Sequence, residues 1–159
     1  MQQLIEQLSE KLLASQQMAV TVESCTGGGI GKALTDVAGS SAWFAGGLIT
    51  YTNESKTQLA GVSATLIQEN GAVSQLVAEA MAQGALQHFH NTVSVAVSGV
   101  AGPGGGTPDK PVGTVCIATC ANQQVFSKRF LFDGDRQQIR EQTIEQAIVM
   151  LIEALSSTK

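Results

Sequence analysis

The sequence predicts an α/β protein, a three-layer α/β/α sandwich with a mixed, mostly parallel sheet and an antiparallel edge hairpin. Over about the first hundred residues, segments with helical apolar spacing alternate with short β-branched runs, as in a parallel sheet covered by helices. Two strand-like runs joined by a polar turn follow, which indicates a hairpin at one edge. A chain of 159 residues suits one domain, so we expect a single domain over 1–159.

The first half of the chain contains most of the alternation. Its expected elements are a helix ending near Ser15, a strand over 18–22, a helix through about Val37, a strand over 46–51, a short helix capped by Asn53 or Glu54, a short helix over 64–69 and a longer helix from Ser74. Apolar residues at helical spacing support the first and last of these helices. The expected apolar face of the last one consists of Leu76, Val77, Ala80, Met81, Gly84 and Ala85.

The second half supplies the centre and the edge of the sheet. An uninterrupted β-branched and apolar run over 92–97 is typical of a central buried strand. Runs over 112–119 and 124–131 predict the hairpin, with its turn at 121–123. The last helix follows Asp135, and its buried stripe is expected to be Ile139, Ile144, Ala147, Ile148, Leu151, Ile152 and Leu155.

Two glycine-rich turns follow predicted parallel strands, one after Val22 and one after Val97. In such sheets, ligands bind at the carboxyl ends of the strands. Both turns, together with Tyr51, are expected to emerge at that edge. The sequence therefore predicts a ligand site there.

The first turn places a hydroxyl, Ser24, directly before a helix start. Backbone N–H groups at Thr26, Gly27 and Gly28 would face an anion or a developing oxyanion. A nucleophile beside its own oxyanion donors is half of an acyl-transfer site. The alternative is an ordinary glycine-rich turn with a capping Ser or Thr.

A serine hydroxyl needs a base, and Lys56 is the better candidate. It closely follows the second predicted strand, and burial or nearby dipoles would lower its pKa enough for it to accept a proton. Tyr51 would assist it. The alternative is an exposed lysine paired with a glutamate. His88 and His90 lie at the end of a long helix, where a solvated terminus is the expected role.

Cys25 is the rival nucleophile, because a helix amino terminus would lower the pKa of its thiol. Its alternative role is a small buried apolar side chain. Cys116 and Cys120 fall on one face of a predicted strand and are expected in the core.

The second turn offers backbone N–H groups to a phosphate or ribose, or it is simply a loop crossing the sheet edge. The candidate ligand groups there are Gly102, Gly104, Gly105 and Thr107. Arg136 and Arg140 lie on successive turns of the last helix, and one of them would bind a phosphate in bidentate fashion. A solvated helix face is the alternative for each.

Composition narrows the classes of partner. The net charge is −4 and there is no basic run, which argues against nucleic-acid binding. No apolar run reaches membrane-spanning length and the amino terminus does not resemble a signal peptide. Three cysteines without C-x-x-C spacing argue against a disulfide framework and zinc, so a cytoplasmic protein is expected.

Only 14% of residues are charged, which suggests a surface buried against another subunit.

Six motifs in order resemble the CinA carboxy-terminal domain family, the nicotinamide-nucleotide amidohydrolases. They are ESCTGG at 23–28, YTNESK at 51–56, GAVS at 71–74, GVAGPGGGT at 99–107, KPVGTV at 110–115 and GDR at 134–136. The resemblance covers the chain from about Leu4 to Leu155.

The resemblance implies hydrolysis of the amide of nicotinamide mononucleotide, without metal or cofactor, by a homodimer. It implies Ser24 as nucleophile, Lys56 as base and Tyr51 as assistant. For the reaction that follows from these roles, we expect the phosphate to bind at the glycine loop, Thr107 or Arg140. A different class of function, a non-catalytic module that binds a nucleotide and regulates a partner, stays open. Nucleotide binding without ammonia release would distinguish it.

Overall fold

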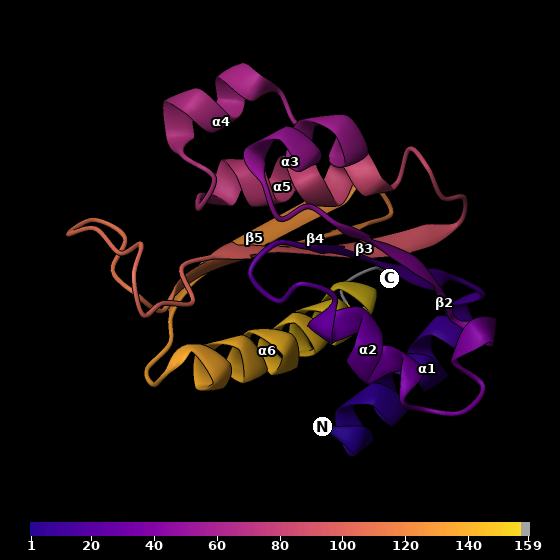
Figure 1. Cartoon of the computed structure of the whole chain (residues 1–159). Helices are drawn as coiled ribbons and strands as arrows, with labels where there is room; N and C mark the ends of the chain where they lie inside the picture. Colours follow the sequence, from indigo (N-terminus) through magenta and orange to yellow (C-terminus); the bar gives the residue numbers. More distant parts are fainter. Residues whose placement is uncertain (157–159) are drawn as a thin grey trace.

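The computed structural model describes residues 1–156 and arranges them in three layers around one sheet (Figure 1). The elements are α1 (Gln2–Ser15), β1 (Met18–Glu23), α2 (Gly29–Thr35), a 3₁₀ turn (Ser40–Ala42), β2 (Phe44–Ile49), α3 (Asn53–Ala60), α4 (Ala64–Asn70), α5 (Gln75–Ala85), β3 (Thr92–Gly99), β4 (Thr114–Ala121), β5 (Gln124–Leu131) and α6 (Arg136–Ser156). Each predicted helix and strand is present.

The sheet has the order β2-β1-β3-β4-β5. β1 pairs in parallel with both β2 and β3, whereas β4 and β5 form the antiparallel hairpin at the edge. The predicted mixed sheet is therefore confirmed. β3 lies in the middle of the sheet, and seven of its eight residues are buried, as expected for a strand covered on both faces.

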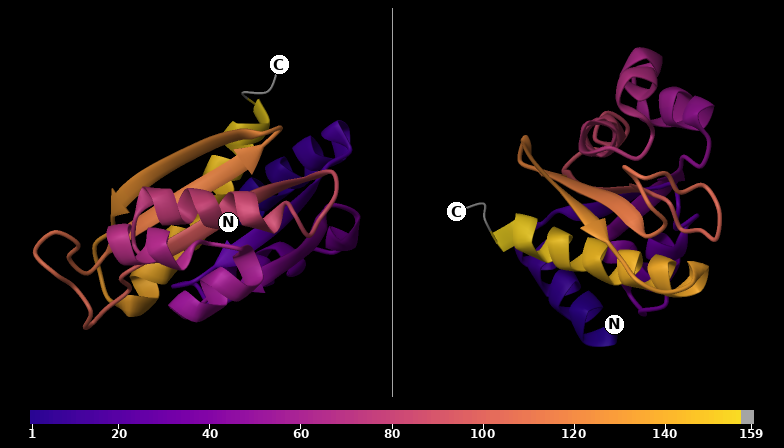
Figure 2. Two further views of the ribbon diagram at one scale, coloured as in Figure 1. Left: turned by 90° about the horizontal axis from the view of Figure 1, so that it is seen from above. Right: turned by 90° about the vertical axis from the view of Figure 1, so that its left-hand side faces the viewer.

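Each face of the sheet is covered by its own set of helices. Helices α1, α2 and α6 cover one face and α3, α4 and α5 cover the other, as both views of Figure 2 show. The strands alternate between the two cores: Val93, Val95 and Val97 join the α6 side, while Ala96 joins the α5 side. Both faces of β3 are therefore buried, and the hydroxyls of Ser94 and Ser98 on the α5 side donate to the backbone carbonyls of Ala82 and Ala72.

The structure corrects two details of the predicted helices. Thr52, not Asn53 or Glu54, caps α3, and its side chain and that of Ser55 form a reciprocal capping box. Leu76 is 51% exposed, because the buried stripe of α5 runs one position later along the helix. That stripe consists of Val77, Ala78, Met81, Ala82, Gly84 and Ala85.

A glycine sets the distance between α5 and α3. A Cβ on Gly84 would lie 1.7 Å from the carbonyl oxygen of Ala60, so only glycine permits this approach. Ala60 ends the helix that carries Lys56. The close packing therefore helps to hold α3 over the carboxyl end of the sheet.

Candidate active site

The carboxyl ends of the three parallel strands meet at a cavity of about 270 Å³. Its lining residues are Ser24, Cys25, Tyr51, Asn53, Lys56, Ala72, Val73, Ser98, Gly99, Ala101 and Arg136. Ser24 follows β1, Tyr51 follows β2, and Ser98 and Gly99 end β3. The structure thus brings together the strand ends that the sequence predicted to converge.

Lys56 and Ser24 form a buried pair in this cavity. Lys56 Nζ donates to Ser24 Oγ at 3.1 Å and to the carbonyl oxygen of Thr50 at 2.9 Å. Lys56 is 1% exposed and Ser24 is 8% exposed. Lys56 lies in the first turn of α3, and the Thr52–Ser55 capping box fixes that turn. The distance between Nζ and Oγ is within the range that proton transfer requires.

Burial lowers the pKa of the Lys56 ammonium, because the charged form loses its hydration. The only ion pair within residues 1–156 joins Lys32 to Asp36, so no carboxylate there offsets the effect at Lys56. The alternative of an exposed lysine paired with a glutamate is therefore wrong. A neutral amine at this position can accept the proton of Ser24.

Cys25 lies beside Ser24 but is not activated. Its side chain is 7% exposed and packs in the core on the α6 side. Burial raises the pKa of the thiol to about 11. The lowering expected from a helix amino terminus is outweighed by this desolvation. Cys116 and Cys120 are buried in the other core, as predicted.

The N–H groups of Gly27 and Gly28, predicted as oxyanion donors, already have acceptors within the chain. The Gly27 N–H donates to the carbonyl oxygen of Ser24 at 3.0 Å. The Gly28 N–H donates to Glu23 Oε2 at 3.0 Å. Within residues 1–156, no other residue accepts a hydrogen bond from the backbone N–H groups of Cys25 and Thr26, although the Cys25 N–H contacts its own thiol. Thr26 therefore stays a candidate, and Cys25 joins it through its backbone.

Tyr51 is at the mouth of the cavity, and its contact is with Arg136 rather than with Lys56. Arg136 Nη2 donates to the Tyr51 hydroxyl at 3.2 Å, and Nη1 donates to the carbonyl oxygen of Gly102 at 2.8 Å. Arg140 Nη2 donates to the carbonyl oxygen of Thr26 at 2.9 Å. Both arginines line an adjoining groove of about 630 Å³, together with Lys32 and the carboxylates of Asp36 and Glu141.

The glycine loop extends away from the cavity. Gly104, Gly105 and Thr107 are exposed, and none of them lines the cavity around Ser24. Thr107 is bonded within the loop, where its hydroxyl accepts from the Lys110 N–H at 3.1 Å. Only the base of the loop reaches the site, through Ala101 and the Gly102 carbonyl. The contact of the substrate phosphate with this loop, at Gly102, Gly104, Gly105 or Thr107, stays a prediction.

Sequence reasoning missed six lining residues, among them Asn53, Ala72 and Ser98, and one buried carboxylate. Asn53, Ala72 and Ser98 line the cavity, and Ser98 Oγ donates to the Ala72 carbonyl at 2.8 Å. Glu23, directly before Ser24, is 1% exposed. A charged residue at the end of an otherwise apolar strand was the available signal for Glu23. His88 is exposed and contacts the Leu59 carbonyl at 3.0 Å, outside the cavity.

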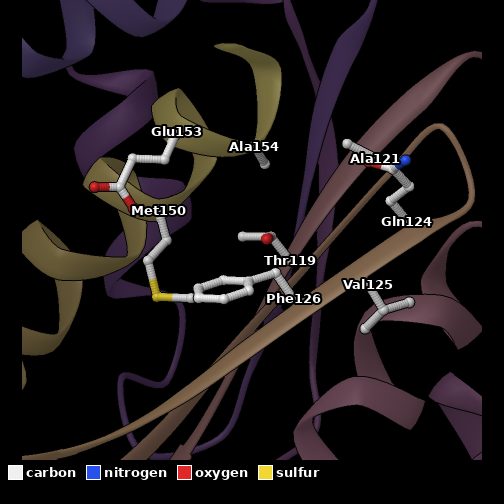
Figure 3. Close-up of a pocket in the computed structure, with 8 residues that line it drawn as sticks. All are labelled: Thr119, Ala121, Gln124, Val125, Phe126, Met150, Glu153 and Ala154. Carbon is white, nitrogen blue, oxygen red and sulfur yellow. The ribbon is translucent and has the colours of Figure 1, made fainter. Parts of the chain in front are cut away.

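A larger cavity, of about 670 Å³, lies elsewhere between the β4–β5 hairpin and α6 (Figure 3). It is lined by Thr119, Ala121, Gln124, Val125, Phe126, Met150, Glu153 and Ala154. The register pairs Thr119 with Val95, near the amino end of β3. This cavity therefore lies beside the amino half of β3, away from Ser24, which follows the carboxyl end of β1.

Two kinds of feature are absent from residues 1–156. No group of three His, Cys, Asp or Glu side chains there is arranged to hold a metal ion. Among the helices of the same residues, none is long and apolar enough to cross a membrane.

Fold and site define an α/β protein with a buried serine–lysine pair at the carboxyl edge of its sheet, and comparison with known proteins gives the family. The model of the CinA C-terminal domain family matches residues 1–155. The chain belongs to this family.

Named relatives agree with this membership. The chain is 50% identical over 150 residues to the nicotinamide-nucleotide amidohydrolase PncC of Pseudomonas putida, covering 94% of each chain. It is 49% identical to a CinA-like protein of Mycolicibacterium gilvum, but spans only 36% of that longer protein. The crystal structure of the competence/damage inducible protein CihA from Agrobacterium tumefaciens superposes with a TM-score of 0.91 at 42% identity, covering 98% of this chain and 94% of that one.

Proposed function

We propose that this protein is an amidohydrolase that converts nicotinamide mononucleotide to nicotinate mononucleotide and ammonia. The observation that carries the proposal is the 3.1 Å contact between a buried Lys56 amine and the Ser24 hydroxyl. The name of the Pseudomonas putida relative supports the substrate class, because the likeness extends over 94% of both chains. Ser24 is the proposed nucleophile and Lys56 the proposed base.

The first half of the reaction forms an acyl-enzyme. Neutral Lys56 takes the proton of Ser24 Oγ while the oxygen attacks the carboxamide carbon. The C–O bond forms, and the electron pair of the C=O bond moves to the carboxamide oxygen. That oxyanion accepts hydrogen bonds from the free N–H groups of Cys25 and Thr26. The C–N bond then breaks, and the proton on Lys56 leaves with ammonia.

The second half releases the product. Water attacks the ester carbon, and Lys56 takes a proton from the water. The bond to Ser24 Oγ breaks, and Lys56 returns the proton to that oxygen. Nicotinate mononucleotide leaves, and the serine–lysine pair is restored. The cycle consumes one water and requires no redox partner.

The substrate needs room and a cation for its phosphate. The carboxamide enters the cavity beside Ser24, and the ribose phosphate extends toward the adjoining groove. Arg136 lines both the cavity and the groove, whereas Arg140 lines only the groove. A guanidinium suits a phosphate because it donates two parallel hydrogen bonds. Arg140, with Arg136 beside it, is the proposed phosphate ligand.

Ammonia release from nicotinamide mononucleotide tests the proposal. We expect the native protein to release one ammonia for each nicotinate mononucleotide formed, measured by a coupled ammonia assay and by chromatography of the nucleotides. A folded protein that binds the nucleotide, for example by calorimetry, but releases no ammonia would instead be a nucleotide-binding module.

A further inference from the structure

Glu23 is a buried carboxylate next to the nucleophile, and the proposed reaction assigns it no step. It ends β1 and is 1% exposed. Its oxygens accept four hydrogen bonds, from Thr26 Oγ1 at 2.7 Å, the Gly28 N–H at 3.0 Å, the Ile30 N–H at 3.0 Å and the Gly31 N–H at 2.8 Å. Within residues 1–156 it forms no ion pair.

These bonds join the end of β1 to the first turn of α2. A buried carboxylate without a cation is costly unless hydrogen bonds replace its lost water. Here a hydroxyl and three backbone N–H groups do so, and the helix dipole favours negative charge at this end. Because both oxygens are engaged, the residues between β1 and α2 are held in one conformation.

The same turn is held from two other sides. The Ser24 N–H donates to the Val97 carbonyl of β3 at 3.1 Å. Arg140 Nη2 donates to the Thr26 carbonyl at 2.9 Å. Glu23 takes up the Gly28 N–H and the Thr26 hydroxyl. Of the backbone N–H groups in this turn, those of Cys25 and Thr26 are the ones left to bind a substrate oxygen.

We propose that Glu23 is a positioning residue for the amidase reaction. Its carboxylate fixes the turn so that Ser24 Oγ stays beside Lys56 and the Cys25 and Thr26 N–H groups stay available to the oxyanion. It also occupies the start of α2, the place where many α/β proteins bind a ligand phosphate. The substrate phosphate must therefore bind elsewhere, on the arginine side. This inference rests on the proposed function.

The variant Glu23→Gln tests the role with almost no change in shape. The glutamine offers one acceptor oxygen, and its NH₂ faces N–H groups that need an acceptor. We expect kcat to fall by about 100-fold, as for a reacting group displaced by about 1 Å, with KM within about threefold of native. Hydrogen exchange of the peptide amides over 24–31 should become faster, an effect that does not depend on catalysis.

Ser94→Ala is the matched control for the loss of a buried hydrogen bond. Ser94 Oγ donates to the Ala82 carbonyl at 2.6 Å on the α5 side of β3, outside the cavity. This variant should keep the native kcat. If Glu23→Gln does not fold, Glu23→Asp replaces it: the charge remains, but the carboxylate is withdrawn by one methylene, and kcat should fall with KM preserved.

The outcomes separate the two proposals. If the native protein releases ammonia and a folded Glu23 variant keeps the native kcat, the positioning role is refuted. A fall in kcat that Ser94→Ala shares to the same extent refutes it as well. If the native protein itself releases no ammonia, the proposed function fails first.

Discussion

Replacing Lys56 by methionine removes the proposed base while keeping the length and apolar stem of the side chain. Lys56 Nζ lies 3.1 Å from Ser24 Oγ, and general base catalysis contributes about 10²- to 10⁴-fold. No other group in the cavity can replace it. The Cys25 thiol stays protonated because its pKa is about 11, and the Tyr51 hydroxyl is bonded to Arg136.

We therefore expect kcat of Lys56→Met to fall by about 10²- to 10⁴-fold, equivalent to about 3 to 5 kcal/mol in the barrier. Lys56→Arg should be as inactive, since a guanidinium keeps the charge and the donors but does not deprotonate. Ammonia release at saturating nicotinamide mononucleotide measures both, with circular dichroism as the test of folding.

Lys110→Met is the matched control. Lys110 Nζ also donates to a backbone carbonyl, that of Asn70, at 2.9 Å, and it does not line the cavity. Its kcat should stay within about threefold of native, as for substitutions outside the reacting groups. A folded Lys56→Met protein that keeps more than a tenth of the native kcat would refute the reasoning.

Three further results are expected. kcat should rise with pH through a lowered Lys56 pKa, because the free amine is the active form and burial favours it; a profile whose inflection stays at the ordinary 10.5 would contradict this. Cys25→Ala should keep kcat within about threefold, since a buried thiol with a raised pKa is not a nucleophile, and loss of activity in a folded variant would make Cys25 the nucleophile. Gel filtration should give a homodimer, about twice the 16.5 kDa chain mass, and a monomer mass would remove the subunit interface inferred from the low charge content.

The fold could be predicted because its signals are local. The β-branched and apolar run over 92–97 predicted β3 as the central strand, and alternation of helices and strands indicated the parallel part of the sheet. Boundaries were less accurate: β2 begins at Phe44 rather than at residue 46. The sequence predicted Asn53 or Glu54 as the cap of α3. The structure has Thr52 there, because the side chains of Thr52 and Ser55 form a capping box together.

The candidate site, like the fold, could be predicted from the sequence only in part. Ser24 and Lys56 were predicted to lie near each other because strand ends converge in a parallel sheet. The sequence could not show which backbone N–H groups of the first turn are free to bind a ligand. That depends on the Glu23 carboxylate, which accepts hydrogen bonds from N–H groups at the start of α2. The burial of Cys25 likewise depends on the core between the sheet and α6, which reverses the pKa shift that the helix start alone suggests.

The most direct measurement is ammonia release from nicotinamide mononucleotide by the native protein and by Ser24→Ala. The account predicts activity in the native protein and a loss of several orders of magnitude in the folded variant, because Ser24 Oγ forms the acyl bond. A Ser24→Ala protein that keeps the native rate would contradict the central claim that this serine is the nucleophile.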